Sequence, residues 1–280
     1  MIVTRFAPSP TGLLHLGHAF AAITAAESGD DFLLRIEDLD RGRSRDGYIE
    51  AIYRDLKWLG LSWDEPVLHQ SRRAPAYAAA LARLSALGLT YPCTCTRKEI
   101  ADEIARAGEA QHYDVSAPSG PGSDGPIYPG TCRHLKSPPP DAPHVLRLDA
   151  AKAAELAGPL RFVEHGKTLP VDPLRFGDIV LARKGYKTEG WPAAYHLAVV
   201  VDDAFQSVTL VTRGEDLLPA THPQRLLQAL LGLPAPSYAH HPLVLDENGK
   251  KFSKRDTSVT LASLRDGGAT PSDIRARLEF

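Results

Sequence analysis

Apolar residues in the first third of the chain follow two different spacings. Residues 2–6 and 32–38 are short segments with the composition of buried strands. Residues 16–27, 48–59 and 75–87 carry apolar side chains at helical spacing, and a glycine lies just after the first and the last of these segments. We read the glycine after residue 27, Gly29, as a helix stop. The succession of strand, helix, strand and helix predicts an α/β sheet whose strands are joined by crossover helices.

The pattern changes over residues 93–170, which contain all three cysteines of the chain. Residues 116–131, within this segment, are rich in proline, glycine and serine. Such a composition predicts a flexible loop, here inside an inserted subdomain.

The α/β pattern returns after the insertion. Residues 178–186 and 207–214 alternate as strands do, and a helix is predicted to begin at Thr221. Thr221 and Gln224 have the spacing of a capping box, and Gly232 is expected to end the helix.

Composition is typical of a soluble globular protein, with 43% hydrophobic and 24% charged residues among 280. The formal net charge of −2 gives no overall signal for nucleic acid, although a local basic face can coexist with it. The N-terminal segment lacks the pattern of a signal peptide, and no apolar run reaches transmembrane length. We therefore expect a cytoplasmic protein with no membrane partner.

Residues 7–20, APSPTGLLHLGHAF, combine a turn-rich loop with the start of a predicted helix. A helix N-terminus after a strand and a loop of small residues favours the binding of phosphate, because its N–H groups and its dipole attract an anion. His15 and His18 share one face of that helix start and could donate hydrogen bonds to phosphate oxygens. Two alternatives are a capped helix with two surface histidines and a metal pair, although no third ligand is near in the sequence.

A second motif, GKKFSKRD at residues 249–256, would by itself indicate a solvated basic loop. Together, HLGH and KFSKR resemble the HIGH and KMSKS signatures of class I aminoacyl-tRNA synthetases. The resemblance extends to the glutamyl branch of that class through five segments that follow the family's order: RFAPSPTGLLHLGHA, FLLRIEDLDRGRS, AAYHLAVVVDDA, TRGEDLL and HPLVLDENGKKFSKRD.

The length of the sequence distinguishes between the full-length and the short members of the glutamyl branch. Full glutamyl-tRNA synthetases continue into a long helical anticodon-binding half, whereas this sequence ends at Phe280. It is therefore similar to the short paralogues of that branch, the glutamyl-Q enzymes. These activate L-glutamate without tRNA and place it on the queuosine base in the anticodon of tRNA(Asp).

The resemblance implies an α/β fold, in which a Rossmann-like class I catalytic domain contains an inserted zinc-bearing subdomain. Residues 1–92 would form the first half of the catalytic domain, and residues 171–256 the second half with the KMSKS-like loop. Residues 93–170 would form the zinc-binding, acceptor-type insertion. Residues 257–280 would be a short appendage, with no anticodon-binding domain. We expect a monomer.

By the same resemblance the reaction is adenylation, in which a glutamate carboxylate attacks the α-phosphate of ATP and expels pyrophosphate. The implied catalytic residues are His15, His18 and Lys254. The implied ATP-binding residues are His15, Gly17, His18, Lys251 and Lys254, with Mg²⁺ bound together with the ATP. The implied glutamate-binding residues are Arg5, Ala7, Ser9, Glu37, Tyr195 and Arg213.

Two of these residues have structural alternatives. Arg213 could form a salt bridge with Glu215 or Asp216, and Glu37 could pair with a nearby arginine, Arg35 or Arg41. An arginine suits a carboxylate because its planar guanidinium group can bind both oxygens.

Cys93 and Cys95 form a CxC pair, and Tyr128 and Cys132 form a YxxxC pair. Three thiolates can hold zinc when a fourth ligand is added. The glutamyl-Q enzymes share this pattern, with the tyrosine as the fourth ligand. The resemblance thus implies one structural zinc per chain, with His134 and His112 as substitute ligands. The alternative is three unligated cysteines.

Three other functions are compatible with parts of the sequence. The first is a shortened glutamyl-tRNA synthetase that charges a tRNA 3′ end. The second is a nucleotidyltransferase that acts on a small metabolite, and the third is an inactive tRNA-binding paralogue. The expected partners under the preferred interpretation are L-glutamate, ATP and tRNA(Asp) that carries queuosine.

Overall fold

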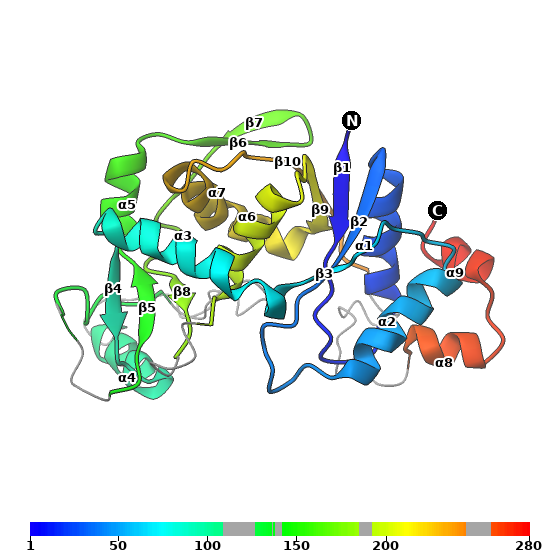
Figure 1. Cartoon of the computed structure of the whole chain (residues 1–280), viewed down its shortest axis with the longest axis horizontal. Helices are drawn as coiled ribbons and strands as arrows, with labels where there is room; N and C mark the ends of the chain where they lie inside the picture. Colours follow the sequence, from blue (N-terminus) through cyan, green and yellow to red (C-terminus); the bar gives the residue numbers. More distant parts are fainter. Residues whose placement is uncertain (109–126, 136, 138–141, 185–191, 245–258) are drawn as a thin grey trace. The chain divides into compact units, whose positions relative to one another are not determined.

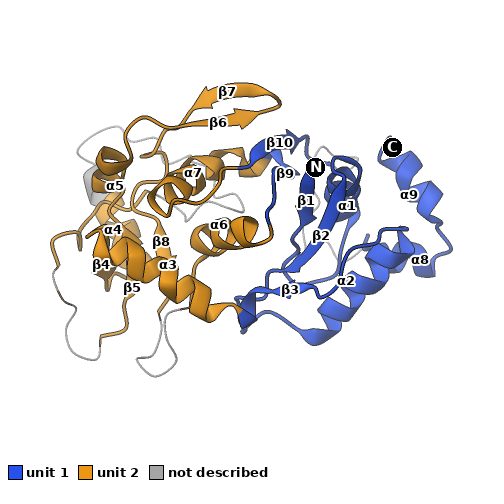
Figure 2. Cartoon of the chain, turned by 45° about the horizontal axis from the view of Figure 1, so that its top comes forward, with its two compact units in different colours: residues 1–72, 207–215, 236–280 blue, residues 73–206, 216–235 orange. Residues whose placement is uncertain are grey.

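The computed structural model describes residues 1–108, 127–135, 137, 142–184, 192–244 and 259–280. These residues form two compact units, which Figure 2 distinguishes by colour. Unit 1 contains residues 1–72, 207–215 and 236–280. Unit 2 contains residues 73–206 and 216–235, so the chain leaves unit 1 and returns to it twice.

Parallel strands form the centre of unit 1 (Figure 1). The strands are β1 (Val3–Phe6), β2 (Asp31–Ile36), β3 (Leu68–His69), β9 (Leu210–Gly214) and β10 (Ser237–His241). β2 pairs with β1 on one side and β3 on the other, and β9 pairs with β10. β9 lies beside β1, where the backbone N–H of Thr209 donates to the carbonyl of Val3 at 3.0 Å. The carboxyl ends of parallel strands share one edge, where ligands of open α/β sheets bind.

Helix α1 (Leu16–Glu27) packs on these strands and follows β1 through the predicted loop. Its buried face consists largely of alanines, and small side chains let the helix approach the sheet closely. Helix α2 (Asp46–Trp58) buries Ile52 and Leu56 in the same hydrophobic core, and a short 3-10 helix (Gln70–Arg72) ends the first segment of the unit.

Gly29 has a different role from the predicted helix stop. The helix ends at Ser28, whose N–H donates to the carbonyls of Thr24 and Ala25. A Cβ atom on Gly29 would lie 2.8 Å from Cγ2 of Thr4 and 2.9 Å from the carbonyl oxygen of Ile2. The glycine is therefore needed because the chain after α1 lies directly against β1.

The C-terminal helices α8 (Leu261–Asp266) and α9 (Pro271–Arg277) belong to unit 1. Leu261, Ile274 and Leu278 are buried in the core that α1, α2 and the strands share. Arg265 on α8 forms a hydrogen-bonded salt bridge with Asp55 on α2, whose side chain is fully buried. Burial raises the pKa of the Asp55 carboxyl although the adjacent guanidinium lowers it.

Unit 2 begins with α3 (Ala74–Ala86) and contains an antiparallel sheet, in which β5 lies between β4 and β8. After α3, the strands and helices of unit 2 are β4 (Thr90–Cys93), α4 (Arg97–Gly108), β5 (Val145–Leu148), α5 (Ala150–Ala157), β6 (Arg161–Glu164), β7 (Lys167–Pro170), β8 (Val180–Ala182), α6 (Tyr195–Phe205) and α7 (Thr221–Leu230). β6 and β7 pair as an antiparallel hairpin, and α6 packs against α3 and α7.

The three helices predicted in the first 90 residues are confirmed within two residues at each end. The capping box predicted at Thr221 is wrong, because a 3-10 helix (Glu215–Ala220) runs directly into α7 and the capping position belongs to Ala220. Gly232 does end α7, with a φ of 60°. The domain boundaries expected at residues 92 and 170 stay predictions.

None of the helices in the described ranges is long and apolar enough to cross a membrane.

The Asp55–Arg265 pair leads to a prediction about stability. Arg265→Ala leaves a buried carboxylate without its cation, which typically costs about 3–5 kcal/mol of unfolding free energy. Urea unfolding should show this loss. Arg275→Ala is the control, because the Arg275–Glu27 pair is half exposed and such pairs contribute about 0–1 kcal/mol. Equal losses in the two variants would contradict the anchoring role of Asp55.

Candidate active site and metal centre

The loops that follow β1 and β2 meet at the carboxyl edge of the strands in unit 1. The N–H of Glu37, just after β2, donates to the carbonyl of Pro8 at 3.0 Å. This contact brings Glu37 beside the segment that contains Ala7 and Ser9, all three predicted to bind glutamate. One of the structural alternatives for Glu37 also exists, because Arg35 Nη2 lies 3.8 Å from Glu37 Oε1.

His15 and His18 lie together at the start of α1. His15 immediately precedes the helix, and its backbone N–H donates to Nδ1 of His18 at 3.2 Å. Since that nitrogen accepts, the proton of a neutral His18 ring is on Nε2 and can be donated. The ring centroids are 3.8 Å apart. A Cβ atom on Gly17 would come within 3.2 Å of the His15 ring, so a glycine at this position leaves room for it.

The same helix start contacts the chain after the second signature. Thr260 forms an isolated β-bridge with His15, and the N–H of Leu261 donates to the carbonyl of Leu14 at 2.8 Å. Residues 245–258, which include the predicted ATP-binding residues Lys251 and Lys254, lie outside the described residues. The second signature begins at residue 251, 233 positions after the first ends at residue 18. Thr260, five residues beyond the second signature, nevertheless contacts His15 of the first.

Arg5 and Arg213 are buried on the neighbouring strands β1 and β9. Arg5 Nη1 donates to the carbonyl of Thr212 at 3.2 Å. Thr212 directly precedes Arg213 on β9, so this bond holds the Arg5 side chain close to the position of Arg213. Arg213 Nε donates to Nε2 of His240 at 3.0 Å, and the two residues are register partners on β9 and β10. The nitrogen of His240 that accepts this bond is unprotonated, so His240 contacts Arg213 as a neutral acceptor.

Sequence reasoning missed His240, since β10 was not predicted as a strand. The signal was available in the alternation of SYAHH, where Tyr238 and His240 fall on one face. Their rings are stacked with an interplanar angle of 6°, and the Arg213 guanidinium lies 5.5 Å from the Tyr238 ring centroid.

Tyr195, the remaining residue predicted to bind glutamate, is the first residue of α6 in unit 2. Its ring contacts the buried His196 edge to face, with centroids 5.3 Å apart.

The four predicted metal ligands come together in unit 2. The sulfur atoms of Cys93, Cys95 and Cys132 all lie within 4.8 Å of one another. Tyr128 Oη is 3.4 Å from Cys95 Sγ, and it accepts the backbone N–H of Cys132 at 2.9 Å. Cys95 and Cys132 sulfurs are 3.4 Å apart, too far for a disulfide.

These distances suit a tetrahedral metal ion. Metal–sulfur bonds of about 2.3 Å place the sulfurs of such a centre about 3.8 Å apart. Three thiols give soft, anionic donors once deprotonated, and the phenol adds one anionic oxygen; the thiolates favour zinc among the common divalent ions. The substitute ligand His134 is exposed on the surface, and His112 lies outside the described residues.

The pKa values of three groups in the cluster are shifted in different directions. Burial raises the pKa of Cys95 to about 11 and also raises the pKa of Tyr128. Burial acts in the same direction on Cys132, but hydrogen bonds from Tyr128, the Thr94 backbone and the other cysteines outweigh it and lower the pKa of Cys132 to about 7. Cys132 is therefore the group that most readily provides a thiolate.

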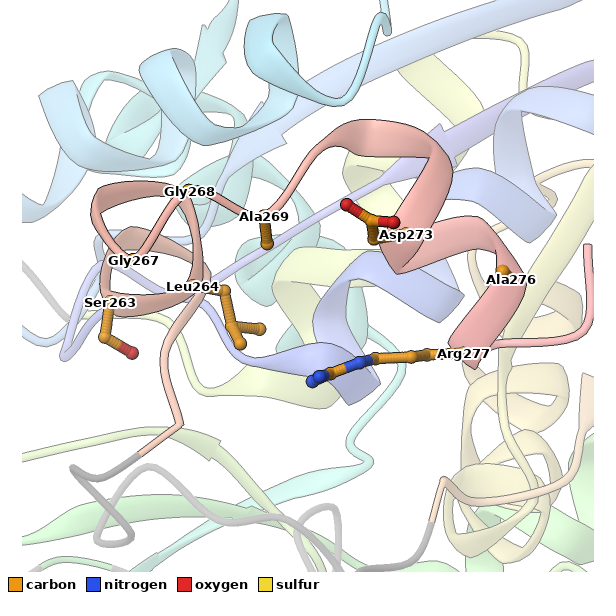
Figure 3. A pocket seen from close by; sticks show the side chains of 8 residues that line it. All are labelled: Ser263, Leu264, Gly267, Gly268, Ala269, Asp273, Ala276 and Arg277. Carbon is orange, nitrogen blue, oxygen red and sulfur yellow. The ribbon is translucent and has the colours of Figure 1, made fainter.

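An open depression of about 610 Å³ lies elsewhere in unit 1, at the turn between α8 and α9 (Figure 3). The Asp273 carboxylate in it already accepts hydrogen bonds from the N–H and hydroxyl of Thr270 at 2.8 and 2.7 Å. Its lining contains no predicted site residue and consists of Ser263, Leu264, Gly267, Gly268, Ala269, Asp273, Ala276 and Arg277.

Residues 1–278 match the family of class I tRNA synthetases (E and Q), catalytic domain. Glutamyl-Q tRNA(Asp) synthetase of Rhodobacter capsulatus is 47% identical over 287 residues, which cover 98% of each chain. The enzyme of the same name from Nocardia farcinica is 45% identical, with 98% of this chain and 82% of the relative covered.

A solved structure agrees with these sequence comparisons. Glutamate-tRNA synthetase from Elizabethkingia anophelis is 29% identical, with a TM-score of 0.69, over 91% of this chain and 53% of that one. The chain thus spans about half the length of that synthetase.

The architecture and the matched family define a ligase of the class I aminoacyl-tRNA synthetase type. Within that class, the chain belongs to the family of the glutamyl-Q tRNA(Asp) synthetases. The predicted family, α/β fold class and enzyme class are confirmed.

Proposed function

We propose that this protein activates L-glutamate with ATP, without tRNA, and transfers the glutamyl group to queuosine in the anticodon of tRNA(Asp). The observation that supports the activation step is the placement of Arg5 and Arg213 on the neighbouring strands β1 and β9, at the edge where the β1 and β2 loops meet. The relatives' name supports the acceptor.

Glutamate has two carboxylates and one ammonium group, and unit 1 offers complementary charges. The guanidinium groups of Arg5 and Arg213 would bind the carboxylates, since a planar fork matches two oxygens. Glu37, whose backbone N–H donates to the Pro8 carbonyl, would bind the ammonium group, with Ala7 and Ser9 alongside it. The hydrogen bond from Arg213 Nε to His240 uses one edge of that guanidinium group and fixes its orientation.

Adenylation needs phosphate charge to be bound and neutralised. One carboxylate oxygen of glutamate would attack the α-phosphorus of ATP, and pyrophosphate would leave with the electrons of the broken P–O bond. His18 Nε2–H and backbone N–H groups in the first turn of α1 would donate to phosphate oxygens, with His15 and Gly17 beside them. Lys251 and Lys254 would supply positive charge, and Mg²⁺ would enter bound to ATP.

We propose zinc as the ion of the cysteine cluster. Cys93, Cys95, Tyr128 and Cys132 would hold it, and four protein ligands leave no position for a substrate, so the site is structural. When bound, zinc would tie the segments around residues 95 and 128 together.

A 3′-charging glutamyl-tRNA synthetase is the second candidate, because the solved structure from Elizabethkingia anophelis has that name and shares the fold. Both candidates use the same activation site and differ in the nucleophile that receives the glutamyl group. Experiments must therefore separate activation from transfer.

Glutamate recognition is tested with Arg213→Ala. Loss of a buried cation that pairs with a carboxylate typically costs about 2–5 kcal/mol, so KM for glutamate should rise steeply in ATP–pyrophosphate exchange without tRNA. Arg213→Lys should not restore it, because an ammonium group lacks the planar fork. Arg225→Ala, which removes a surface contact to the Arg161 carbonyl, is the control. Unchanged glutamate affinity in Arg213→Ala would place the amino-acid site elsewhere.

The zinc site is tested by metal analysis. Freshly purified protein should contain about one zinc per chain, since the proposed site would hold one ion with its four ligands. Cys95→Ser and Cys132→Ser should lose the metal and lower Tm, and Tyr128→Phe should bind it more weakly. Tyr77→Phe removes the hydroxyl of another buried tyrosine, which donates to Asp202, and should keep the zinc. Zinc-free protein purified without chelators would contradict the proposal.

The acceptor is tested with two altered tRNAs. A tRNA(Asp) without its terminal adenosine should still accept labelled glutamate, because single-stranded anticodon bases can be splayed into a pocket. A tRNA(Asp) transcript without queuosine should accept none. The reverse result would identify a 3′-charging enzyme, whereas activation of glutamate would be unaffected by either outcome.

A further inference from the structure

Asp178 is fully buried in unit 2 and receives an unusual number of hydrogen bonds. Its carboxylate accepts from Tyr91 Oη at 2.5 Å, from Arg133 Nε and Nη2 at 3.0 and 2.7 Å, and from the N–H of Ala150 at 2.9 Å. Its carbonyl accepts from Arg147 Nη1 at 2.7 Å. One residue thus joins β4, the segment after Cys132, β5 and the start of α5.

Two of these partners are close to cysteines of the metal cluster in the chain. Tyr91 precedes Cys93 by two residues on β4, so the two side chains share one face of the strand. Arg133 directly follows Cys132, and both of its hydrogen bonds to Asp178 restrain the turn that presents the Cys132 sulfur. A shift of this turn would move the sulfur with it.

The third partner, Arg147, contacts another predicted ligand, Tyr128. The Arg147 guanidinium lies over the ring of Tyr128, with Cζ 4.0 Å from the ring centroid. Arg147 is 8% exposed and Tyr128 is 4% exposed. The Asp178 carbonyl holds the guanidinium in this position, and the guanidinium in turn fixes the ring plane that carries Oη.

The charges of this arrangement also suit an occupied metal centre. Three thiolates and a phenolate around Zn²⁺ have a net negative charge, which is costly to bury without a compensating cation. Arg147 provides a buried cation on the face of the Tyr128 ring, and a guanidinium is attracted to an aromatic face. The outer groups around metal ligands orient them and tune the affinity for the metal.

We infer that Asp178 is a positioning residue of the metal centre: its carboxylate aligns Cys132 through Arg133, and its backbone carbonyl aligns Tyr128 through Arg147. This inference rests on the proposed zinc site and is independent of the proposed acceptor. The hydrogen bonds of Asp178 go to Tyr91, Arg133, Arg147 and Ala150 and not to a donor atom of the four ligands, so Asp178 acts through these partners.

A second buried aspartate provides a matched control. Asp202 in α6 is fully buried and accepts from Tyr77 Oη at 2.6 Å and from Arg73 Nε at 3.0 Å, so it has the same kinds of partner as Asp178. Its partners lie at the start of α3 and are not adjacent to a metal ligand in the chain. Asp178→Asn and Asp202→Asn therefore remove the same charge from similar surroundings in one unit.

The experiment measures the zinc dissociation constant of the full chain by competition with a chromophoric chelator. The absorption spectrum of the Co²⁺-substituted protein reports the ligand geometry. Asp178→Asn should bind zinc about 10–100-fold more weakly, the range typical for outer-shell groups, and should change the Co²⁺ bands. Asp202→Asn should keep the wild-type affinity for zinc and the wild-type spectrum, even if its Tm falls as much as that of Asp178→Asn.

Arg147→Met keeps an apolar stem over the Tyr128 ring without the guanidinium, and it covers the case in which Asp178→Asn does not fold. It should weaken zinc binding and change the Co²⁺ bands in the same sense. Wild-type affinity and spectrum in a folded Asp178→Asn or in Arg147→Met would overturn the inference, and so would equal weakening in Asp202→Asn. Failure of the wild-type protein to bind zinc would instead overturn the zinc site itself.

Discussion

The contact between β1 and β9 is the constraint on which the candidate active site depends. Val3 donates its N–H to Oγ1 of Thr209 across 206 residues of sequence, and Arg5 reaches the carbonyl of Thr212 across 207. The contacts advance in the same direction along both strands, from Val3 with Thr209 to Arg5 with Thr212, so the carboxyl end of β9 lies beside that of β1. Arg213 and the loop that carries His15 and His18 consequently belong to the same edge of unit 1. Without this contact, Arg213 would not lie beside Arg5 and the loops that carry Ala7, Ser9 and Glu37.

Buried aspartate–arginine pairs recur at the points where distant segments join. Asp55 and Arg265 tie α2 to α8, Asp202 and Arg73 tie α6 to the start of α3, and Asp178 ties Arg133 to β4 and α5. A buried ion pair is weak as a source of net stability, since desolvation offsets much of the attraction. It is demanding in geometry, however, because an unpaired buried charge is costly. Such pairs therefore specify which segments meet.

The cysteine cluster would join distant segments in a similar way if it holds the proposed zinc. Cys95 and Tyr128 are separated by 33 residues, and their side chains are 3.4 Å apart. The entropy of closing a loop rises only slowly with its length, so a metal can join such distant segments at modest extra cost. The pairing of β4 with β5 already brings Cys93 opposite Val145, and the bond from Arg147 on β5 to Asp178 extends this order toward Tyr128.

The sequence alone determined the local elements and the kinds of chemistry. Spacing of apolar residues predicted α1, α2 and α3 because amphipathic periodicity is a local property. The motifs with His15, Cys93 and Tyr128 predicted phosphate and metal chemistry by residue type. The role of Gly29, the continuous helix before Thr221, the bond from Arg213 to His240 and the hub at Asp178 were decided by tertiary structure. Each of these depends on which segment lies opposite, and hydrogen bonds between residues tens to hundreds of positions apart leave no periodic trace in the chain.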